Sequence, residues 1–171
     1  MISVIRKCND LPSQSKLWST RIMKIAVASE HRGFKAKDKI LSLVRELHHE
    51  GLDFGPSTDE MCDYPDYAAK AARAVASGEV DRAILIGGTG IGMTIVANKI
   101  RGIRAALCHD VLSAQISRSH NNANILCLSV DLIATASMPR MIQTWIDTPF
   151  EGGRHERRVD KISHYEREFL G

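Results

Sequence analysis

A glycine-rich loop stands between an apolar run and a helical pattern in the middle of the chain. The stretch reads AILIGGTGIGMTIVANK over residues 83–99, with glycines at 87, 88, 90 and 92. Glycines leave the backbone N–H groups of such a loop unhindered, and the loop leads into the amino end of a helix. This geometry favours an anion, either a phosphate or an oxyanion formed during a reaction. Thr89 adds a hydroxyl donor within the loop.

Two other interpretations of the loop stay open. A dinucleotide fingerprint requires G-x-G-x-x-G and an acidic residue about 20 positions further on. Here the third glycine comes one residue early, and Asp110 matches the acidic position only loosely. The Gly-Lys-Ser/Thr sequence of nucleotide hydrolases is absent from the loop. The other interpretation is a purely structural tight turn, because glycines also serve turns that bind nothing.

Short apolar runs alternate with longer amphipathic segments from Lys24 onward. We expect strands over 24–29, 52–55, 82–87, 103–108 and 124–129, and helices over 33–51, 63–80, 93–100, 110–121, 133–148 and 151–170. The alternation predicts βαβ units, and therefore an α/β fold with a parallel sheet and helices on both faces. Because such sheets bind ligands at the carboxyl ends of their strands, Glu30-His31, the glycine loop, Cys108-His109-Asp110 and the end of the last strand should share one edge.

Composition and charge exclude several classes of protein. The 171 residues, 44% of them hydrophobic, indicate one globular domain with a substantial core. A net charge of +3 and 5% aromatic residues do not indicate a nucleic-acid partner. No apolar run approaches the roughly 20 residues of a membrane span, so no membrane partner is expected. The four cysteines have no CxxC spacing, which indicates reduced thiols in a cytoplasmic protein and neither a zinc site nor disulfides.

The first residues differ in character from the rest of the chain. Residues 1–22 are polar and unpatterned, and charges interrupt any apolar signal segment. We expect them to form a disordered extension, or to be an artefact of an upstream start with translation beginning at Met23. The domain itself is expected to span residues 23–171.

Six motifs occur in a characteristic order along the domain. They are HRGF (31–34), DYPDYA (63–68), GGTGIGMTIVANK (87–99), GIRAALC (102–108), SAQISRSHNNAN (113–124) and EGGRHERRV (151–159). Together they resemble the ribose-5-phosphate isomerase B family, which includes subunits of galactose-6-phosphate isomerase. The resemblance runs from Met23 to about Tyr165 without large gaps.

The resemblance implies a fold, an assembly and a reaction. The fold would be a three-layer α/β/α domain with a five-stranded, Rossmann-like parallel sheet. The assembly would be a homodimer or dimer of dimers whose active site is shared between subunits. The reaction would interconvert an aldose phosphate and its ketose phosphate, such as ribose 5-phosphate and ribulose 5-phosphate, through a cis-enediolate without metal or other cofactor. Such a reaction needs a base, donors for the enediolate oxygens and cations for the phosphate.

The resemblance also assigns residues to the reacting end of the sugar. His120 matches the histidine that opens the furanose ring, although a capping or core histidine is the alternative. Asn121 would hold a sugar hydroxyl. The backbone at Gly88, Gly90 and Gly92, together with the Thr89 hydroxyl, would cradle the enediolate oxygen.

A second set of residues is assigned to the phosphate and the walls of the site. Arg154 and Arg158 are one helical turn apart and can face one phosphate, although a solvated charged helix face is the alternative. His31 would complete the contacts to the phosphate or the ring oxygen. Asp63 matches a polar position lining the site, and is equally suited to capping a helix.

Three departures from the family pattern concern the base and the phosphate. One branch of the family has a cysteine base at the position of Gly87, and another has a glutamate base at the position of Met93. Neither Gly87 nor Met93 can carry the proton, and Gly87 would only line the substrate site. The usual Asp-His after the first strand is Glu30-His31. A family arginine of the phosphate site is replaced by Asp131, so either Asp131 is paired with an arginine or the substrate is held differently.

Two functions follow from these departures. In the first, the protein is an active isomerase in which Glu30 replaces the missing base. In the second, it is a catalytically degenerate sugar-phosphate-binding subunit of a hetero-oligomeric isomerase. The sequence leaves the sugar itself open.

Overall fold

The computed structural model describes residues 21–169, so residues 1–20 of the expected N-terminal extension lie outside the described part of the chain. Five parallel strands form one sheet in the order β2-β1-β3-β5-β4. The prediction of a parallel five-stranded sheet is therefore confirmed. The strands are β1 (Lys24–Ser29), β2 (Glu50–Asp53), β3 (Arg82–Gly87), β4 (Ala105–Leu107) and β5 (Ile125–Ser129).

Helices connect the strands, and their ends follow from local chemistry. Pro65 lies in the first turn of α2, where its missing N–H costs nothing, and Gly78 ends that helix with a left-handed φ of 78°. Asp110 caps α4 by accepting a hydrogen bond from the Ser113 N–H at 2.6 Å. The helices are α1 (Phe34–Glu46), α2 (Tyr64–Ser77), α3 (Ile91–Ala97), α4 (Val111–Ser119), α5 (Met138–Asp147) and α6 (Arg154–Phe169), with short 3-10 turns η3 (His31–Gly33) and η4 (Thr135–Ser137).

Several predicted boundaries are wrong, and two of them have a clear local cause. The strand expected over 52–55 begins at Glu50, because α1 ends at Glu46 and His48 turns the chain with a φ of 62°. The helix expected over 133–148 begins at Met138, because Pro139 fits an α-helix only in its first turn. The five residues before it contain the short turn η4 instead of a regular α-helix.

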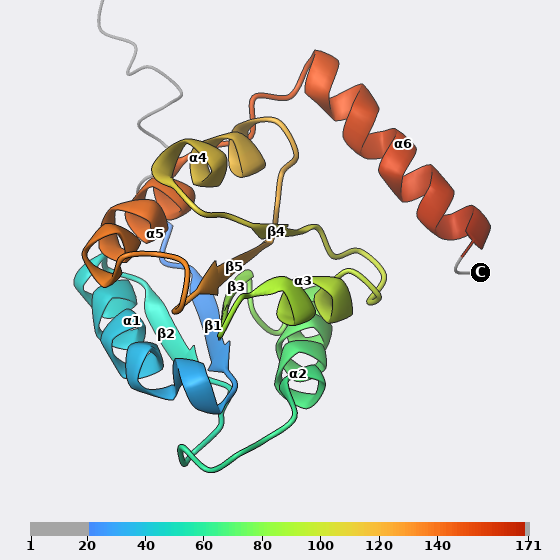
Figure 1. Ribbon diagram of the computed structural model, residues 1–171. Coiled ribbons are helices and arrows are strands. Elements are labelled where there is room, and N and C mark those ends of the chain that lie inside the picture. Colours follow the sequence, from blue (N-terminus) through green and yellow to red (C-terminus); the bar gives the residue numbers. More distant parts are fainter. Residues whose placement is uncertain (1–20, 170–171) are drawn as a thin grey trace, which may run out of the picture.

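The strands separate two layers of helices, which confirms the three-layer α/β/α architecture (Figure 1). Alternate strand residues face opposite sides, as the period of a strand requires. On β3, Ile84 and Ile86 pack with side chains of α1, α4 and α5, whereas Ala83 and Leu85 pack with those of α2 and α3. Small side chains on the second side let α2, which is rich in buried alanines, lie close to the sheet.

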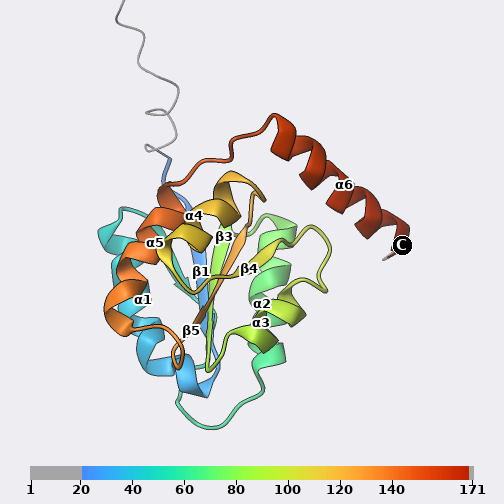
Figure 2. The ribbon, with the colours of Figure 1, turned by 45° about the horizontal axis from the view of Figure 1, so that its top comes forward.

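The last helix stands apart from these layers. Figures 1 and 2 show α6 extending away from the body of the domain, beyond the C-terminal end of α4. Only His155 and Val159 are buried on it, while Ile162, Tyr165 and Phe169 are exposed. None of the helices described between residues 21 and 169 is both long and apolar enough to cross a membrane.

Close packing at Gly33 fixes the turn that follows β1, and a substitution there tests it. A Cβ at Gly33 would lie 2.7 Å from the Ile86 carbonyl oxygen, whereas a Cβ at Gly51 would meet its nearest atom at 3.3 Å. Gly33→Ala should therefore lower the free energy of unfolding by about 2 kcal/mol, and Gly51→Ala by less than about 1 kcal/mol. Urea denaturation of both variants checks this. Equal losses would show that the contact with the end of β3 does not constrain the turn.

Candidate functional site

The carboxyl ends of β1 and β3 meet where the chain changes direction in the sheet, because β2 lies on one side of β1 and β3 on the other. Such a switch point is the usual ligand site of doubly wound sheets. Glu30 follows β1 here and is buried, with 5% of its surface exposed. Its Oε1 accepts a hydrogen bond from the Gly88 N–H at 2.8 Å, and its Oε2 accepts one from the Arg32 N–H at 2.8 Å.

His31 lies beside the same carboxylate. Its Nδ1 is 2.8 Å from Glu30 Oε2, a close contact without the alignment of a hydrogen bond, and a third of its side chain is exposed. Asp131 follows β5 on the other side of β3, and its N–H donates to the Gly88 carbonyl oxygen. We call Glu30, His31, residues 87–92 and Asp131 the carboxyl-edge group.

The glycine loop presents its backbone at this edge. The N–H of Gly88 donates a hydrogen bond to Glu30. Within residues 21–169 the N–H groups of Gly90 and Gly92 have no acceptor and can bind a ligand oxygen. Gly90 has a φ of 74°, and a Cβ there would lie 2.7 Å from Leu107, so both conformation and space require glycine. The exposed Thr89 accepts from the Ile91 N–H at 3.3 Å, which leaves its hydroxyl proton free to donate.

The Asp63 motif borders the loop through its neighbour Tyr64. A Cβ at Gly92 would lie 2.6 Å from the Tyr64 ring, so the ring rests directly on the loop. Asp63 is exposed at the N-cap of α2 and makes no capping hydrogen bond, so this bond does not engage its carboxylate. Tyr64 was not singled out by sequence reasoning, although it lies within the DYPDYA motif.

The other predicted residues form a second group. His120 is the C-cap of α4, and its ring stacks on that of His155 with centroids 4.1 Å apart and planes inclined by 9°. Arg154 donates from Nε to His155 Nε2 at 3.2 Å. The positive charge of Arg158 also reaches His155 and helps to lower its pKa. We call His120, Asn121, Arg154, His155 and Arg158 the α6 group.

Glu151 brings a carboxylate close to both stacked histidines. Its Oε2 is 3.9 Å from His120 Nε2 and 3.7 Å from His155 Nε2, so three potential metal ligands lie within 4.8 Å of one another. Parallel imidazole rings, however, direct their lone pairs side by side, whereas a metal requires them to converge. The Arg154 donor also occupies His155 Nε2. The arrangement therefore suits two stacked histidines better than a metal centre.

Two arginines hold the turn that carries His120 and Asn121. Arg118 donates from Nη1 to the Asn122 side chain at 2.8 Å and to the Ala123 carbonyl oxygen at 2.6 Å. Arg104 donates from Nε to the carbonyl oxygens of Asn121 and Asn122. These bonds fix a turn in which Asn122 has a φ of 47°, and the Asn-Asn pair after His120 is its sequence signal.

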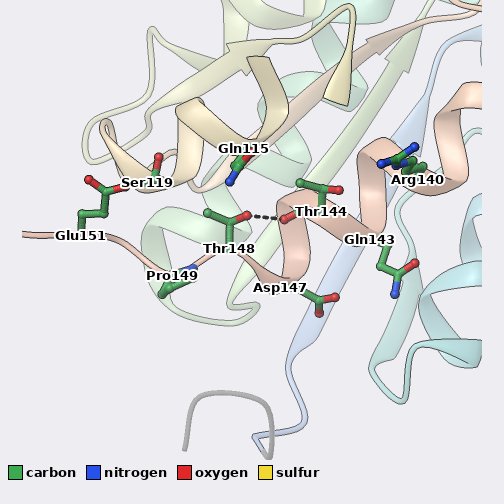
Figure 3. A pocket seen from close by; sticks show the side chains of 9 residues that line it. All are labelled: Gln115, Ser119, Arg140, Gln143, Thr144, Asp147, Thr148, Pro149 and Glu151. Atoms are coloured by element: carbon green, nitrogen blue, oxygen red, sulfur yellow. Dashed lines mark hydrogen bonds between the residues drawn. The ribbon is translucent and has the colours of Figure 1, made fainter. Parts of the chain in front are cut away.

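A polar groove of about 500 Å³ adjoins the α6 group, between α4, α5 and the segment before α6 (Figure 3). Figure 3 shows Glu151 and Ser119 at one end of it and Arg140 at the other. The Thr148 hydroxyl donates to the Thr144 carbonyl oxygen within the groove. None of its lining residues belongs to the carboxyl-edge group.

The two groups lie at opposite edges of the sheet. In a parallel sheet each helix returns the chain to the amino edge, so His120 at the end of α4 precedes β5 while the glycine loop follows β3. A five-residue strand such as β5 separates these edges by about 16 Å. Figure 2 shows the same separation, with α6 at the top and the start of α3 at the bottom. Within one chain the predicted site residues are therefore not brought together.

The fold and the glycine loop define the class of this protein, a Rossmann-like α/β protein with a glycine-rich loop at the carboxyl edge of a parallel sheet, which is where such sheets bind ligands. A family model described as Ribose/Galactose Isomerase matches residues 25–162. The chain belongs to this family.

Individual relatives agree with this assignment over nearly their whole length. A putative sugar phosphate isomerase of Bacillus subtilis is 48% identical over 149 residues, covering 86% of this chain and 100% of that protein. Ribose-5-phosphate isomerase B of Escherichia coli is 43% identical over 143 residues, covering 84% of this chain and 96% of that protein. The structure of ribose-5-phosphate isomerase B from Clostridium thermocellum superposes with a TM-score of 0.84 at 44% identity, covering 86% of this chain and 99% of that one.

Protonation of His155 should destabilise the fold. Burial lowers the pKa of this histidine from its usual 6.5, with further lowering by His120 and the neighbouring arginines. Its folded pKa is thus below its unfolded pKa, so the unfolded state binds more protons and stability falls as the pH drops below about 6.5. His155→Gln should flatten this dependence in urea denaturation between about pH 5 and pH 7.5.

The exposed His164 offers a matched control, because its side chain is 67% exposed on the same helix. His164→Gln should leave the slope of stability against pH unchanged. A His155→Gln variant with the wild-type slope would contradict the interpretation of His155 as a buried neutral histidine.

Proposed function

We propose that the protein is an aldose–ketose isomerase that moves a proton between C1 and C2 of a sugar phosphate through an enediolate. Ribose 5-phosphate and ribulose 5-phosphate are the pair to test first, because relatives at 43% and 44% identity are named ribose-5-phosphate isomerase B. The observation that carries the proposal is the position of the Glu30 carboxylate next to Gly87. That carboxylate would act as the base in place of the family's cysteine at position 87 or glutamate at position 93.

Glu30 reaches the space that a side chain at Gly87 would enter. A Cβ built on Gly87 lies 3.8 Å from Glu30 Oε1, so the carboxylate is in van der Waals contact with the position where a cysteine side chain would begin. Each carboxylate oxygen has two lone pairs, and the bonds from the N–H groups of Gly88 and Arg32 leave acceptor capacity for a proton. This placement favours the active isomerase over the catalytically degenerate subunit.

The thiols of Cys127 on β5 and of Cys108 directly after β4 are poor alternatives as bases. Burial raises the pKa of Cys127 to about 12, and it also raises that of Cys108. Both side chains are buried, so their protonated forms persist near neutral pH.

The remaining roles in the reaction would be taken by residues at the carboxyl and amino edges of the sheet. Gly90 and Gly92 would donate their N–H groups, and Thr89 its hydroxyl, to the enediolate oxygen as its charge develops. Gly87 and Gly88 would line the sugar, and Asp63 the opposite wall. His120 would transfer the proton that opens the ring, and Asn121 would hold a hydroxyl.

The separation of the two groups supports a homodimer, or a dimer of dimers, and the free cysteines of the described residues are in keeping with a location in the cytoplasm. In this assembly the carboxyl-edge group of one subunit would meet the α6 group of its partner. Arg154 and Arg158 of the partner would bind the phosphate together with His31. The exposed apolar side chains of α6, with Tyr165 and Phe169 among them, give this helix a surface to bury against a second copy.

Replacing the proposed base should abolish proton transfer. Glu30→Gln keeps the shape of the side chain and removes its basicity, so kcat should fall about a hundredfold to ten-thousandfold. The incorporation of solvent deuterium at C1 or C2 of ribose 5-phosphate, followed by NMR, measures the step directly. A Glu30→Gln variant with unchanged turnover would contradict the assignment.

A compensating pair provides the control. Glu30→Asp withdraws the carboxylate by one methylene and should lower kcat, whereas Glu30→Asp combined with Gly87→Cys restores a base at the loop. A Cβ at position 87 would have its tightest contact, at 3.3 Å, with the flexible Met93 side chain, and it would lie 3.6 Å from the Gly90 nitrogen, an ordinary van der Waals distance, so the backbone should accommodate it. Recovery of deuterium exchange in the double variant is expected. Loss of folding, checked by thermal denaturation, would separate a structural effect from a catalytic one.

A further inference from the structure

An ion pair spans the carboxyl edge above the glycine loop. Arg32, in the turn η3 after β1, contacts Asp131 after β5 through Nη2, at 2.8 Å from Oδ1 and 2.7 Å from Oδ2. These residues are 99 positions apart in the chain, and β3 lies between their strands. The pair therefore crosses the switch point at which the proposed substrate would lie.

The pair rests directly on Gly88. A Cβ there would lie 2.9 Å from Arg32 Nε and 3.0 Å from Asp131 Oδ2, so a side chain at this position would displace the pair. Asp131 is itself held in place, because its N–H donates to the Gly88 carbonyl oxygen at 3.1 Å. The Arg32 backbone is fixed in turn by its N–H bond to Glu30. Both ends of the pair are thus anchored to the proposed active site.

The geometry leaves part of the guanidinium free. Both carboxylate oxygens of Asp131 approach the same nitrogen, Nη2, so within residues 21–169 the Nη1 donors have no acceptor. More than half of the Arg32 side chain is exposed, compared with about a third of that of Asp131. The hydrogen bond and charge of Asp131 raise the pKa of Arg32, which keeps the group cationic at every physiological pH.

From this geometry we infer that Arg32 binds the phosphate group of the substrate and that Asp131 is its positioning residue, an assignment that rests on the proposed function. A guanidinium is planar and has five donors, so it can bind a carboxylate on one side and a phosphate on another. Because Coulomb energy falls with distance, a phosphate on Nη1 lies nearer to the positive charge than to Asp131 and is attracted overall. Because Arg32 offsets its charge, the carboxylate of Asp131 can lie next to a bound anion.

The assignment is tested with inorganic phosphate as the probe, measured by calorimetry, and with ribose 5-phosphate kinetics. Arg32→Met should raise the phosphate Kd and the KM for ribose 5-phosphate by about ten- to a hundredfold, with kcat changed by less than about threefold. Asp131→Ala should raise both constants by a smaller factor. In the Arg32→Met background, Asp131→Ala should cause no further weakening, because Asp131 acts through Arg32.

Arg21 supplies the matched control. It forms an equally short pair with Asp81, at 2.7 Å, but at the amino edge of the sheet. Arg21→Met should therefore leave the phosphate Kd unchanged. If Arg32→Met also leaves it unchanged, or if the wild type binds no phosphate, the assignment is overturned.

Two further outcomes separate this assignment from the proposed function. Weakened phosphate binding in Arg32→Met would support the role of Arg32 even if the wild type isomerised no sugar phosphate, which would refute the proposed function alone. If Arg32→Met weakens the binding of unphosphorylated ribose as strongly as that of phosphate, the pair binds hydroxyls and the assignment is overturned.

Discussion

The carboxylate of Glu30 is the constraint on which the carboxyl edge depends. One oxygen holds the N–H of Gly88 after β3, and the other holds the N–H of Arg32 in the turn after β1. A buried carboxylate without partners is costly, so these two bonds fix the glycine loop and the turn relative to one another. The positions of His31, the loop N–H groups and the Arg32–Asp131 pair all follow from this link. A residue placed this way is also preorganised for the chemistry proposed for it.

The second general feature is the division of the proposed site between two edges of the sheet. Parallel topology sends the end of α4, and with it His120, to the edge opposite the glycine loop. The helix α6 extends further from the domain and buries little of itself within the chain. Each chain thus has two incomplete groups, and two copies related by a twofold axis would complete two sites.

Much of the fold could be predicted from the sequence, because each strand is a short apolar run between turn residues. Ile84 and Leu85 within RAILIG illustrate this: the whole run is buried, as parallel strands covered on both faces require. Local patterns could not give the order of the strands, which is a property of the whole packed sheet. They also misplaced the start of α5, where Pro139 carries the only clear local signal.

The candidate site was also predictable in part. The rule that parallel strands present ligands at their carboxyl ends correctly placed Glu30 beside the glycine loop. That Asp131 pairs with an arginine was one of two expectations from the sequence, but Arg32 could not be identified as the partner, since the pair joins segments 99 positions apart. The stacking of His155 on His120 likewise depends on the path of the chain after α5. That His120 follows a helix and precedes a strand was, however, a readable sign that it lies at the amino edge.

The central claim is that one active site draws Glu30 from one chain and His120 from another. Heterodimers of a Glu30→Gln chain and a His120→Ala chain, co-expressed with different tags and purified through both, test it most directly. Each heterodimer has one intact site and one doubly altered site, so it should show about half of the wild-type isomerase activity although both parents are nearly inactive. A heterodimer no more active than its parents would place the whole site within one chain and contradict the account.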